Sequence, residues 1–394
     1  MKKTLLLALG GLLLVSCKPV LQNTFGRYQI NKMHNGGTVT NKNYTVEVPF
    51  KVIDGQIILK VFTDQNSKDT LNFLFDTDSY SGVSIKKYEQ FKGDFAELRT
   101  ENFDNNKVVT ETEVYLVEKL YIGDILVEDV NLTIDEYFNK NIDGVIGVDF
   151  MKDKVFTFDL SNNKLFISDI SPEENPNDYR FKITKDWRKV YSTKINIEGQ
   201  EMKFVFDTGR TGFMHTTDKL KLSSNQQISY ELIARGNEGY RSGTFTLIQT
   251  QNLSFNNNKV DKAIILKSSD YSGNFLGTKI LMENKVILDC NKMQMILKLK
   301  DEKIKMNAKD FPTHSFAFGW FDGLKVVQKK VEALSIDLEL FDEIVEINGN
   351  KIPNSTKKVA ELLESLKYEK IWHLKVKRND RIMDVQIPSS ILEY

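Results

Sequence analysis

The sequence predicts a mainly β protein with two equivalent β lobes and a different C-terminal α+β module. Short β-branched and aromatic runs, separated by Asn, Asp and Gly turns, fill the chain from Tyr44 to about residue 300. A motif around Asp76 recurs around Asp207, which indicates a duplicated lobe. Beyond about residue 308 the pattern changes to strands around one amphipathic helix.

The N-terminus predicts export and a lipid anchor. Lys2 and Lys3 precede an apolar run from Leu5 to Val15, which has the length of a signal-peptide core and is too short to span a bilayer. Leu14-Val15-Ser16-Cys17 resembles a bacterial lipobox, and this resemblance implies a signal peptide over residues 1–17 and lipidation of Cys17. The alternative is an ordinary secretory signal. We expect a protein of the cell envelope, anchored to a bacterial membrane and facing the periplasm, with residues 18–43 as a polar tether.

Short hydrophobic runs predict the strands of both lobes. Pro172, Pro176 and the polar segment between them interrupt this pattern, so we expect lobe 1 over residues 44–172 and lobe 2 over residues 178–302. The clearest strand candidates are Tyr44 to Val52, Gln56 to Phe62, Leu71 to Phe75, Val114 to Ile122 and Val155 to Leu160.

Three landmarks recur in the same order in both lobes. Phe73-Leu74-Phe75-Asp76-Thr77 returns as Phe204-Val205-Phe206-Asp207-Thr208, and Val145-Ile146-Gly147 returns as Phe275-Leu276-Gly277. Phe156 to Asp159 corresponds to Val286 to Asp289. The offsets are 131, 130 and 130 positions. A period this long indicates duplicated domains, because solenoid repeats have periods of about 20 to 50 residues.

These motifs resemble the aspartic peptidases of the pepsin and retropepsin type, in particular bacterial lipoproteins of the aspartyl protease family. The resemblance covers residues of about 44 to 300 and implies two acid-protease β-barrel lobes. It implies that Asp76 and Asp207 form the catalytic dyad of an aspartic endopeptidase whose substrate is a polypeptide. The supporting residues that it implies are Thr77, Thr208, Gly209, Gly147 and Gly277.

Two carboxylates brought close together cannot both ionise, so they share one proton. One carboxylate then activates a water as general base while the other polarises the scissile carbonyl, which requires no metal. Two departures from the family pattern leave an alternative open. Asp78 replaces the turn glycine of lobe 1, in a turn that reads one residue longer than that of lobe 2, and Arg210 could pair with Asp78 or with Asp207. The alternative is an inactive peptide-binding lipoprotein.

The C-terminal module over residues 308–394 resembles a PDZ domain. Asp342 to Ile352 reads as strand, Asn-Gly turn and strand, and a helix from Lys357 to Leu366 follows. The resemblance implies binding of a peptide C-terminus by strand addition, with Phe318-Gly319-Trp320 as the candidate loop. Core packing of these aromatics, or docking between domains, is the alternative. The closing strands are expected at Trp372 to Val376 and Arg381 to Ile387.

Composition excludes several other functions. The 394 residues hold 54 Lys and Arg against 54 Asp and Glu, so no positive excess favours nucleic acid. Two cysteines cannot build a disulfide framework, and the four histidines lack metal-ligand spacing, so we expect no metal and no cofactor. The turn at Asn105-Asn106 is the candidate flap that closes over substrate.

Overall fold

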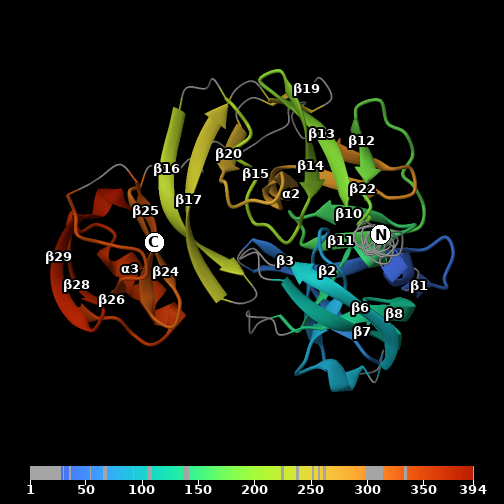
Figure 1. Cartoon of the computed structure of the whole chain (residues 1–394), viewed down its shortest axis with the longest axis horizontal. Helices are drawn as coiled ribbons and strands as arrows, with labels where there is room; N and C mark the ends of the chain where they lie inside the picture. Colours follow the sequence, from blue (N-terminus) through green and yellow to red (C-terminus); the bar gives the residue numbers. More distant parts are fainter. Residues whose placement is uncertain are drawn as a thin grey trace, which may run out of the picture.

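Figure 1 shows a computed structural model of the chain, which is mainly β, as predicted. Three parts are distinguished below: the first β unit (residues 38–168), the second β unit (residues 179–298) and the C-terminal unit (residues 316–393). The structure describes residues 28–393 except 30, 35–36, 54, 65–68, 92, 104–108, 136–141, 223–225, 237–238, 251–252, 256–257, 261–262, 299–313 and 332–334.

The first β unit contains the strand runs expected for lobe 1, and the predicted run Leu71 to Phe75 forms one strand residue for residue. Two 3-10 turns, η1 (Tyr88–Gln90) and η2 (Val148–Met151), lie between strands. The strands are β1 (Thr38–Val39), β2 (Thr45–Ile53), β3 (Gln56–Phe62), β4 (Leu71–Phe75), β5 (Gly82–Ser84), β6 (Asp94–Phe103), β7 (Val109–Ile122), β8 (Ile125–Asp135), β9 (Gly144–Ile146), β10 (Val155–Asp159) and β11 (Lys164–Ser168).

The expected tether is too long, because the fold begins before Tyr44. Met33 is fully buried against Leu98 and Val114 of the first β unit, and its carbonyl accepts a hydrogen bond of 3.1 Å from Asn131 Nδ2. β1 pairs antiparallel with β8. The polar composition of this stretch concealed two buried side chains, Met33 and His34, and one short strand. Cys17 and residues 18–27 lie outside the described residues.

The second β unit repeats the strand order of the first. A short helix α2 (Lys279–Glu283) follows the second glycine segment. The predicted boundary between Pro172 and Pro176 falls in the connection from β11 to β12. The strands are β12 (Tyr179–Lys185), β13 (Tyr191–Ile197), β14 (Gln200–Phe206), β15 (Met214–Thr216), β16 (Gln226–Gly236), β17 (Gly239–Thr250), β18 (Leu253–Phe255), β19 (Asn258–Val260), β20 (Ala263–Lys267), β21 (Phe275–Leu276), β22 (Lys285–Asp289) and β23 (Gln294–Lys298).

A six-stranded antiparallel sheet joins the two β units in the order β2-β11-β10-β22-β23-β12. At its centre Thr157 of β10 pairs with Ile287 of β22. These two residues are counterparts in the repeat, 130 positions apart. A local two-fold axis therefore passes between them and relates the two units.

One hydrophobic core runs through both β units, from Val48 to Leu297, and includes Phe156 and Leu288 of the joining sheet. The C-terminal unit has a separate core that contains Trp372 and Leu374. Because the first two units share their buried surface, they are expected to stabilise each other.

The C-terminal unit has the predicted helix and hairpin. α3 (Thr356–Leu366) buries Val359, Leu363 and Leu366, and the Asn348-Gly349 turn has positive φ at both residues (49° and 80°), as a two-residue hairpin requires. A 3-10 turn, η4 (Ser389–Ile391), precedes the last strand. The strands are β24 (Phe316–Trp320), β25 (Leu324–Lys330), β26 (Glu343–Ile347), β27 (Asn350–Lys351), β28 (Ile371–Arg378), β29 (Arg381–Pro388) and β30 (Leu392–Glu393).

The long hairpin β16–β17 stands between the C-terminal unit and the rest of the chain (Figure 1). β16 pairs antiparallel with β25 from Tyr230 opposite Lys330 to Leu232 opposite Gln328. Its counterpart in the first unit is the hairpin β6–β7, whose tip includes the predicted flap turn Asn105-Asn106 and lies outside the described residues. No helix in the described part of the chain is long and apolar enough to cross a membrane.

Candidate active site

Two turns, one from each β unit, meet through crossed threonines. Thr77 Oγ1 donates to the Phe206 carbonyl at 2.5 Å, and Thr208 Oγ1 donates to the Phe75 carbonyl at 2.6 Å. Each hydroxyl also accepts the backbone N–H of the other threonine, at 3.2 and 3.1 Å. Both threonines are completely buried. Four hydrogen bonds without solvent access therefore fix the turns against each other.

Parallel strand pairs deliver the two aspartates into this junction. β4 pairs with β9 and β14 pairs with β21, so Asp76 N–H reaches the Ile146 carbonyl at 3.0 Å and Asp207 N–H reaches the Leu276 carbonyl at 2.9 Å. The two carboxyl groups are close enough for the charge of Asp207 to raise the pKa of Asp76. The strand tips, 131 positions apart in sequence, therefore bring their carboxyl groups together.

The three glycines singled out in the sequence are required for space. A Cβ at Gly147 would collide with the backbone of Ser79 and Tyr80, and one at Gly277 would collide with the Gly212 carbonyl. A Cβ at Gly209 would collide with the Asp76 carboxyl group. The glycine segments therefore lie directly behind the two turns, and Gly209 lets the aspartate of the other unit approach.

Burial changes the proton affinities of the two aspartates unequally. Burial and the neighbouring charge of Asp207 raise the pKa of Asp76 well above its ordinary range. Burial also raises the pKa of Asp207, but the Arg210 guanidinium opposes that rise. Arg210 therefore favours the ionised form of Asp207.

Arg210 pairs with Asp207, which is one of the two possibilities that the sequence left open. Its Nε lies 2.7 Å from Asp207 Oδ2. The guanidinium also stacks on Phe275, 3.9 Å from the ring centroid, and lies 5.4 Å from that of Tyr271. Tyr271 is in turn 2.9 Å from Nδ1 of His215, and burial lowers the pKa of His215 to about 3, so this ring is neutral.

Asp78 adds a third carboxyl group beside the pair. Burial, followed by the charge of Asp207, raises its pKa to about 7. Its Oδ1 is buried and accepts no hydrogen bond from the described residues, although Arg188 lies 3.9 Å away. Its φ is not positive, so an aspartate fits the backbone of this turn without strain. Its backbone N–H donates to Asp76 Oδ1 at 3.0 Å, as Gly209 N–H does to Asp207 Oδ1.

The expectation of a longer turn in lobe 1 is wrong. Val145 pairs with Gly82 and its counterpart Phe275 pairs with His215, so Gly82 corresponds to His215 and not to Gly212. The connection from the aspartate to this strand is therefore two residues shorter in the first unit. Ser81 Oγ accepts the Gly147 N–H there, whereas the Phe213 carbonyl accepts the Gly277 N–H in the second unit.

Several neighbouring residues were not found by sequence reasoning. Gln56 Nε2 donates to the Gly209 carbonyl at 2.9 Å, and Thr278 Oγ1 donates to the Gly55 carbonyl at 2.9 Å. Buried Asp149 accepts the Ser81 N–H at 2.6 Å. Thr278 could have been noticed because it follows Gly277. Gln56 and Asp149 have no matching residue in the repeat, so nothing marked them.

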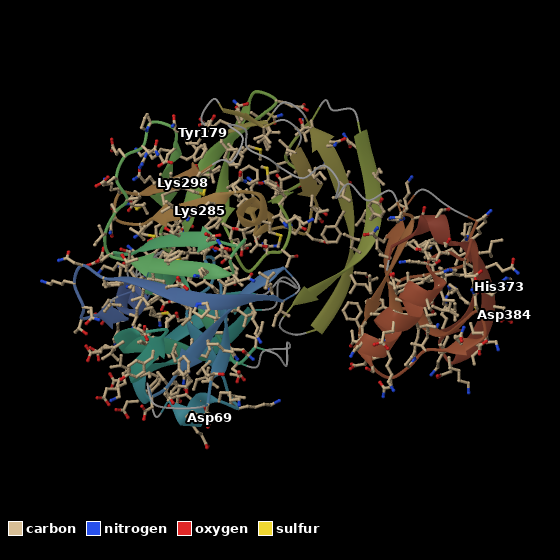
Figure 2. All side chains as sticks on the ribbon, turned by 180° about the vertical axis from the view of Figure 1, so that it is seen from behind. Asp69, Tyr179, Lys285, Lys298, His373 and Asp384 are labelled. Atoms are coloured by element: carbon tan, nitrogen blue, oxygen red, sulfur yellow. The ribbon has the colours of Figure 1, made fainter. Side chains whose placement is uncertain are left out.

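The predicted peptide-binding residues of the C-terminal unit lie in a strand. Phe318 is buried in its core and Gly319 pairs with Lys325 of β25, so these residues form no free loop. β30 pairs with the start of β24. Phe341, where the PDZ pattern has glycine, takes φ +69°. A cavity of ≈ 390 Å³ lies elsewhere, on the outer sheet face, where Figure 2 shows His373 and Asp384 at the edge of the molecule.

No protein-family model and no curated protein matches the chain. Among solved structures, it is similar to the crystal structure of basic 7S globulin from soybean, with a TM-score of 0.41 and 12% sequence identity. That alignment covers 65% of this chain and 96% of the globulin. A similarity of this size carries no argument about function. Within the described ranges, no three His, Cys, Asp or Glu side chains gather closely enough to hold a metal ion.

Proposed function

We propose that the chain is an aspartic endopeptidase with two pepsin- or retropepsin-like lobes and a C-terminal PDZ-like domain. The observation that carries the proposal is the pair of crossed threonine turns, which bring the buried carboxyl groups of Asp76 and Asp207 together where the two β units meet. A buried carboxyl pair that shares one proton has the chemistry to activate water and polarise a peptide carbonyl.

The asymmetry of the pair suggests a role for each member. Asp207, ionised beside Arg210, would take a proton from the attacking water, and Asp76, protonated, would donate a hydrogen bond to the carbonyl oxygen of the substrate. The substrate would be an extended polypeptide. A lipid on Cys17 would hold the enzyme at a bacterial membrane, facing the periplasm, and the C-terminal unit would bind or orient a peptide C-terminus.

The second candidate is an inactive peptide-binding relative, and one contact favours it. The 2.7 Å ion pair with Arg210 lowers the proton affinity of Asp207 and therefore its strength as a base. A protein in which Arg210 keeps the Asp207 carboxylate permanently paired would retain the two-unit fold and lose the chemistry.

Hydrolysis of a denatured protein between pH 3 and pH 7 separates the two candidates. The endopeptidase predicts cleavage by the wild type and a loss of about 100-fold or more in Asp207→Asn, because a general base is removed. Asp218→Asn, an exposed aspartate of the same unit, is the matched control and retains activity. Equal cleavage by the wild type and Asp207→Asn contradicts a role for the dyad. Binding of denatured protein without cleavage at any pH supports the inactive relative.

A further inference from the structure

Asp78 and Arg210 are the two places where each turn departs from its counterpart in the other unit. Asp78 corresponds to Gly209, since both follow the Asp-Thr pair. Arg210 corresponds to Ser79, because its carbonyl accepts the Thr278 N–H just as that of Ser79 accepts the Val148 N–H. One departure adds a carboxylate to the site, and the other adds a guanidinium on the opposite side of the junction.

Steric crowding at the two turns connects Asp78 with Arg210, because each of them lies next to Asp207. Gly209 has no room for a side chain, because a Cβ there would collide with the Asp76 carboxyl group. By the two-fold relationship of the units, a side chain at position 78 would be expected to meet Asp207 in the same way. Position 78 nevertheless carries a side chain, and the carboxylate of Asp207 is held by Arg210.

The hold of Arg210 on Asp207 is rigid. The Arg210 carbonyl accepts the Thr278 N–H at 2.8 Å and the Thr278 hydroxyl at 3.1 Å, and the guanidinium stacks on Phe275. The side chain of Arg210 is only 17% exposed. Both the backbone and the guanidinium of Arg210 are therefore held in place. Its ion pair with Asp207 Oδ2 is already formed and requires no further ordering of the arginine side chain.

Other titratable groups lie near the site, but they offset the negative charge of Asp78 less than Arg210 does. Arg188 lies 3.9 Å from Asp78 Oδ1, and its Nε is already bonded to Asp186 at 3.2 Å. Tyr271 and His215, which pack beside Arg210, are neutral between pH 4 and pH 8, because burial raises the pKa of the phenol and lowers that of the imidazole. Arg210 is therefore the cation in direct contact with the dyad.

We propose that Asp78 and Arg210 are a matched pair of positioning residues that act in opposite directions on the proton shared by Asp76 and Asp207. Asp78 increases the affinity of the dyad for that proton by like-charge repulsion, and Arg210 decreases it by ion pairing. Because the side chain at position 78 lies next to Asp207, the ion pair with Arg210 also keeps the Asp207 carboxylate in a position that is compatible with Asp78. The catalytic consequence rests on the proposed endopeptidase function, whereas the effect on proton affinity does not.

Four proteins test the pair: the wild type, Asp78→Gly, Arg210→Ser and the double variant. Each single change copies the residue of the other unit at the equivalent position. Two readouts are used over pH 3 to 8, the melting temperature and the rate of cleavage of a denatured protein. Protonation of a group with a raised pKa stabilises the fold at low pH, and this contribution is lost as the pH rises from the unfolded-state pKa to the folded-state pKa. The pH at which the melting temperature stops falling therefore reports the proton affinity of the folded site.

Arg210→Ser is expected to move that pH upward by about one unit, and Asp78→Gly to move it downward by about one unit. The double variant is expected to return close to the wild type. The shift caused by Arg210→Ser is expected to be larger when Asp78 is present than in the Asp78→Gly background, because the two residues interact through Asp207. The pH of maximal cleavage should follow the same order.

Two results would contradict the proposed roles of Asp78 and Arg210. The first is a pH shift of the same sign in both single variants, and the second is an Arg210→Ser shift of equal size with Asp78 and with Asp78→Gly. The two proposals fail in different ways. Opposite, coupled shifts in melting temperature without cleavage by any of the four proteins support the pair and contradict the endopeptidase. Cleavage that depends on Asp207, together with melting and pH profiles that neither single change moves, supports the endopeptidase and contradicts the pair.

Discussion

At the scale of single residues, the site depends on which atoms are deprived of water. Thr77 and Thr208 have no solvent access, so the four hydrogen bonds of their hydroxyl and amide groups have no replacement if one partner is removed. Glycine is required at position 209 because a Cβ there would collide with the Asp76 carboxyl group. Its φ is not positive, so the backbone conformation itself does not require glycine. The charge of Arg210 then makes two otherwise equivalent aspartates unequal.

Asp149 gives the residue-scale prediction. Burial raises its pKa to about 6, and its Oδ1 accepts the Ser81 N–H at 2.6 Å behind the first turn. A carboxyl group with a raised folded-state pKa stabilises the fold fully below about pH 4 and loses that contribution as the pH rises through about 6. Asp149→Asn keeps an oxygen acceptor for Ser81 and has no charge to bury.

The stability of Asp149→Asn relative to the wild type is therefore expected to increase by about 3 kcal/mol at most between pH 4 and pH 7. Urea denaturation at a series of pH values measures this difference. Asp153→Asn, at an exposed position four residues later, is the control and should show no such trend. A difference that stays constant with pH for Asp149→Asn would mean that this carboxyl group titrates normally in the folded protein.

At the scale of elements, the pairing of a strand edge connects one hairpin of the second β unit to the C-terminal unit. β16 uses part of its outer edge to pair with β25, so the hairpin β16–β17 is tied to the C-terminal unit. The Val331 N–H extends this contact by donating to the Ser229 carbonyl at 2.9 Å. A ligand that moved β25 would therefore pull on a hairpin of the second β unit.

Val331→Pro tests this connection, because proline has no backbone N–H to donate. The side chain of Val331 is exposed, so replacing it should disturb little packing. We expect faster amide hydrogen exchange at residues 229–232, where β16 meets β25, with little change in the six-stranded joining sheet. Val331→Ala, which keeps the N–H, is the matched control. Unchanged protection of residues 229–232 in Val331→Pro would show that this edge pairing adds little to the hold on β16.

At the scale of the whole molecule, two separate cores divide the chain. The first and second β units share one core across the sheet that joins them, whereas the C-terminal unit has its own. The units on either side of the joining sheet are expected to unfold together, because one hydrophobic core extends through both of them. The C-terminal unit is expected to give a second transition.

Two core truncations test this division by calorimetry. Leu374→Ala, in the C-terminal core, should lower only the transition of the C-terminal unit, and Leu288→Ala, in the joining sheet, should lower only that of the two β units. Each change is expected to cost about 2 to 5 kcal/mol, the usual range for a buried Leu→Ala substitution. If either substitution lowered both transitions equally, the chain would unfold as a single unit.

The sequence by itself determined the mainly β class, most strand positions, the helix α3, the hairpin turn at Asn348-Gly349 and the repeat around Asp76 and Asp207. These features are local, because each depends on residues a few positions apart or on a motif that occurs twice. The predicted turn length and tether were wrong for a physical reason. Strand register and the burial of Met33 depend on partners about 60 to 100 positions away, which a local pattern does not contain.

Only the tertiary structure decided how the charges of the site are arranged. The sequence showed that Arg210 could reach either Asp78 or Asp207, and the choice between them follows from its stacking on Phe275 and from the fixed carbonyl of its own turn. Likewise, the burial that raises the proton affinity of Asp76 comes from two units closing over it. Electrostatic energies depend on distance and solvent access in three dimensions, and neither is encoded in spacing along the chain.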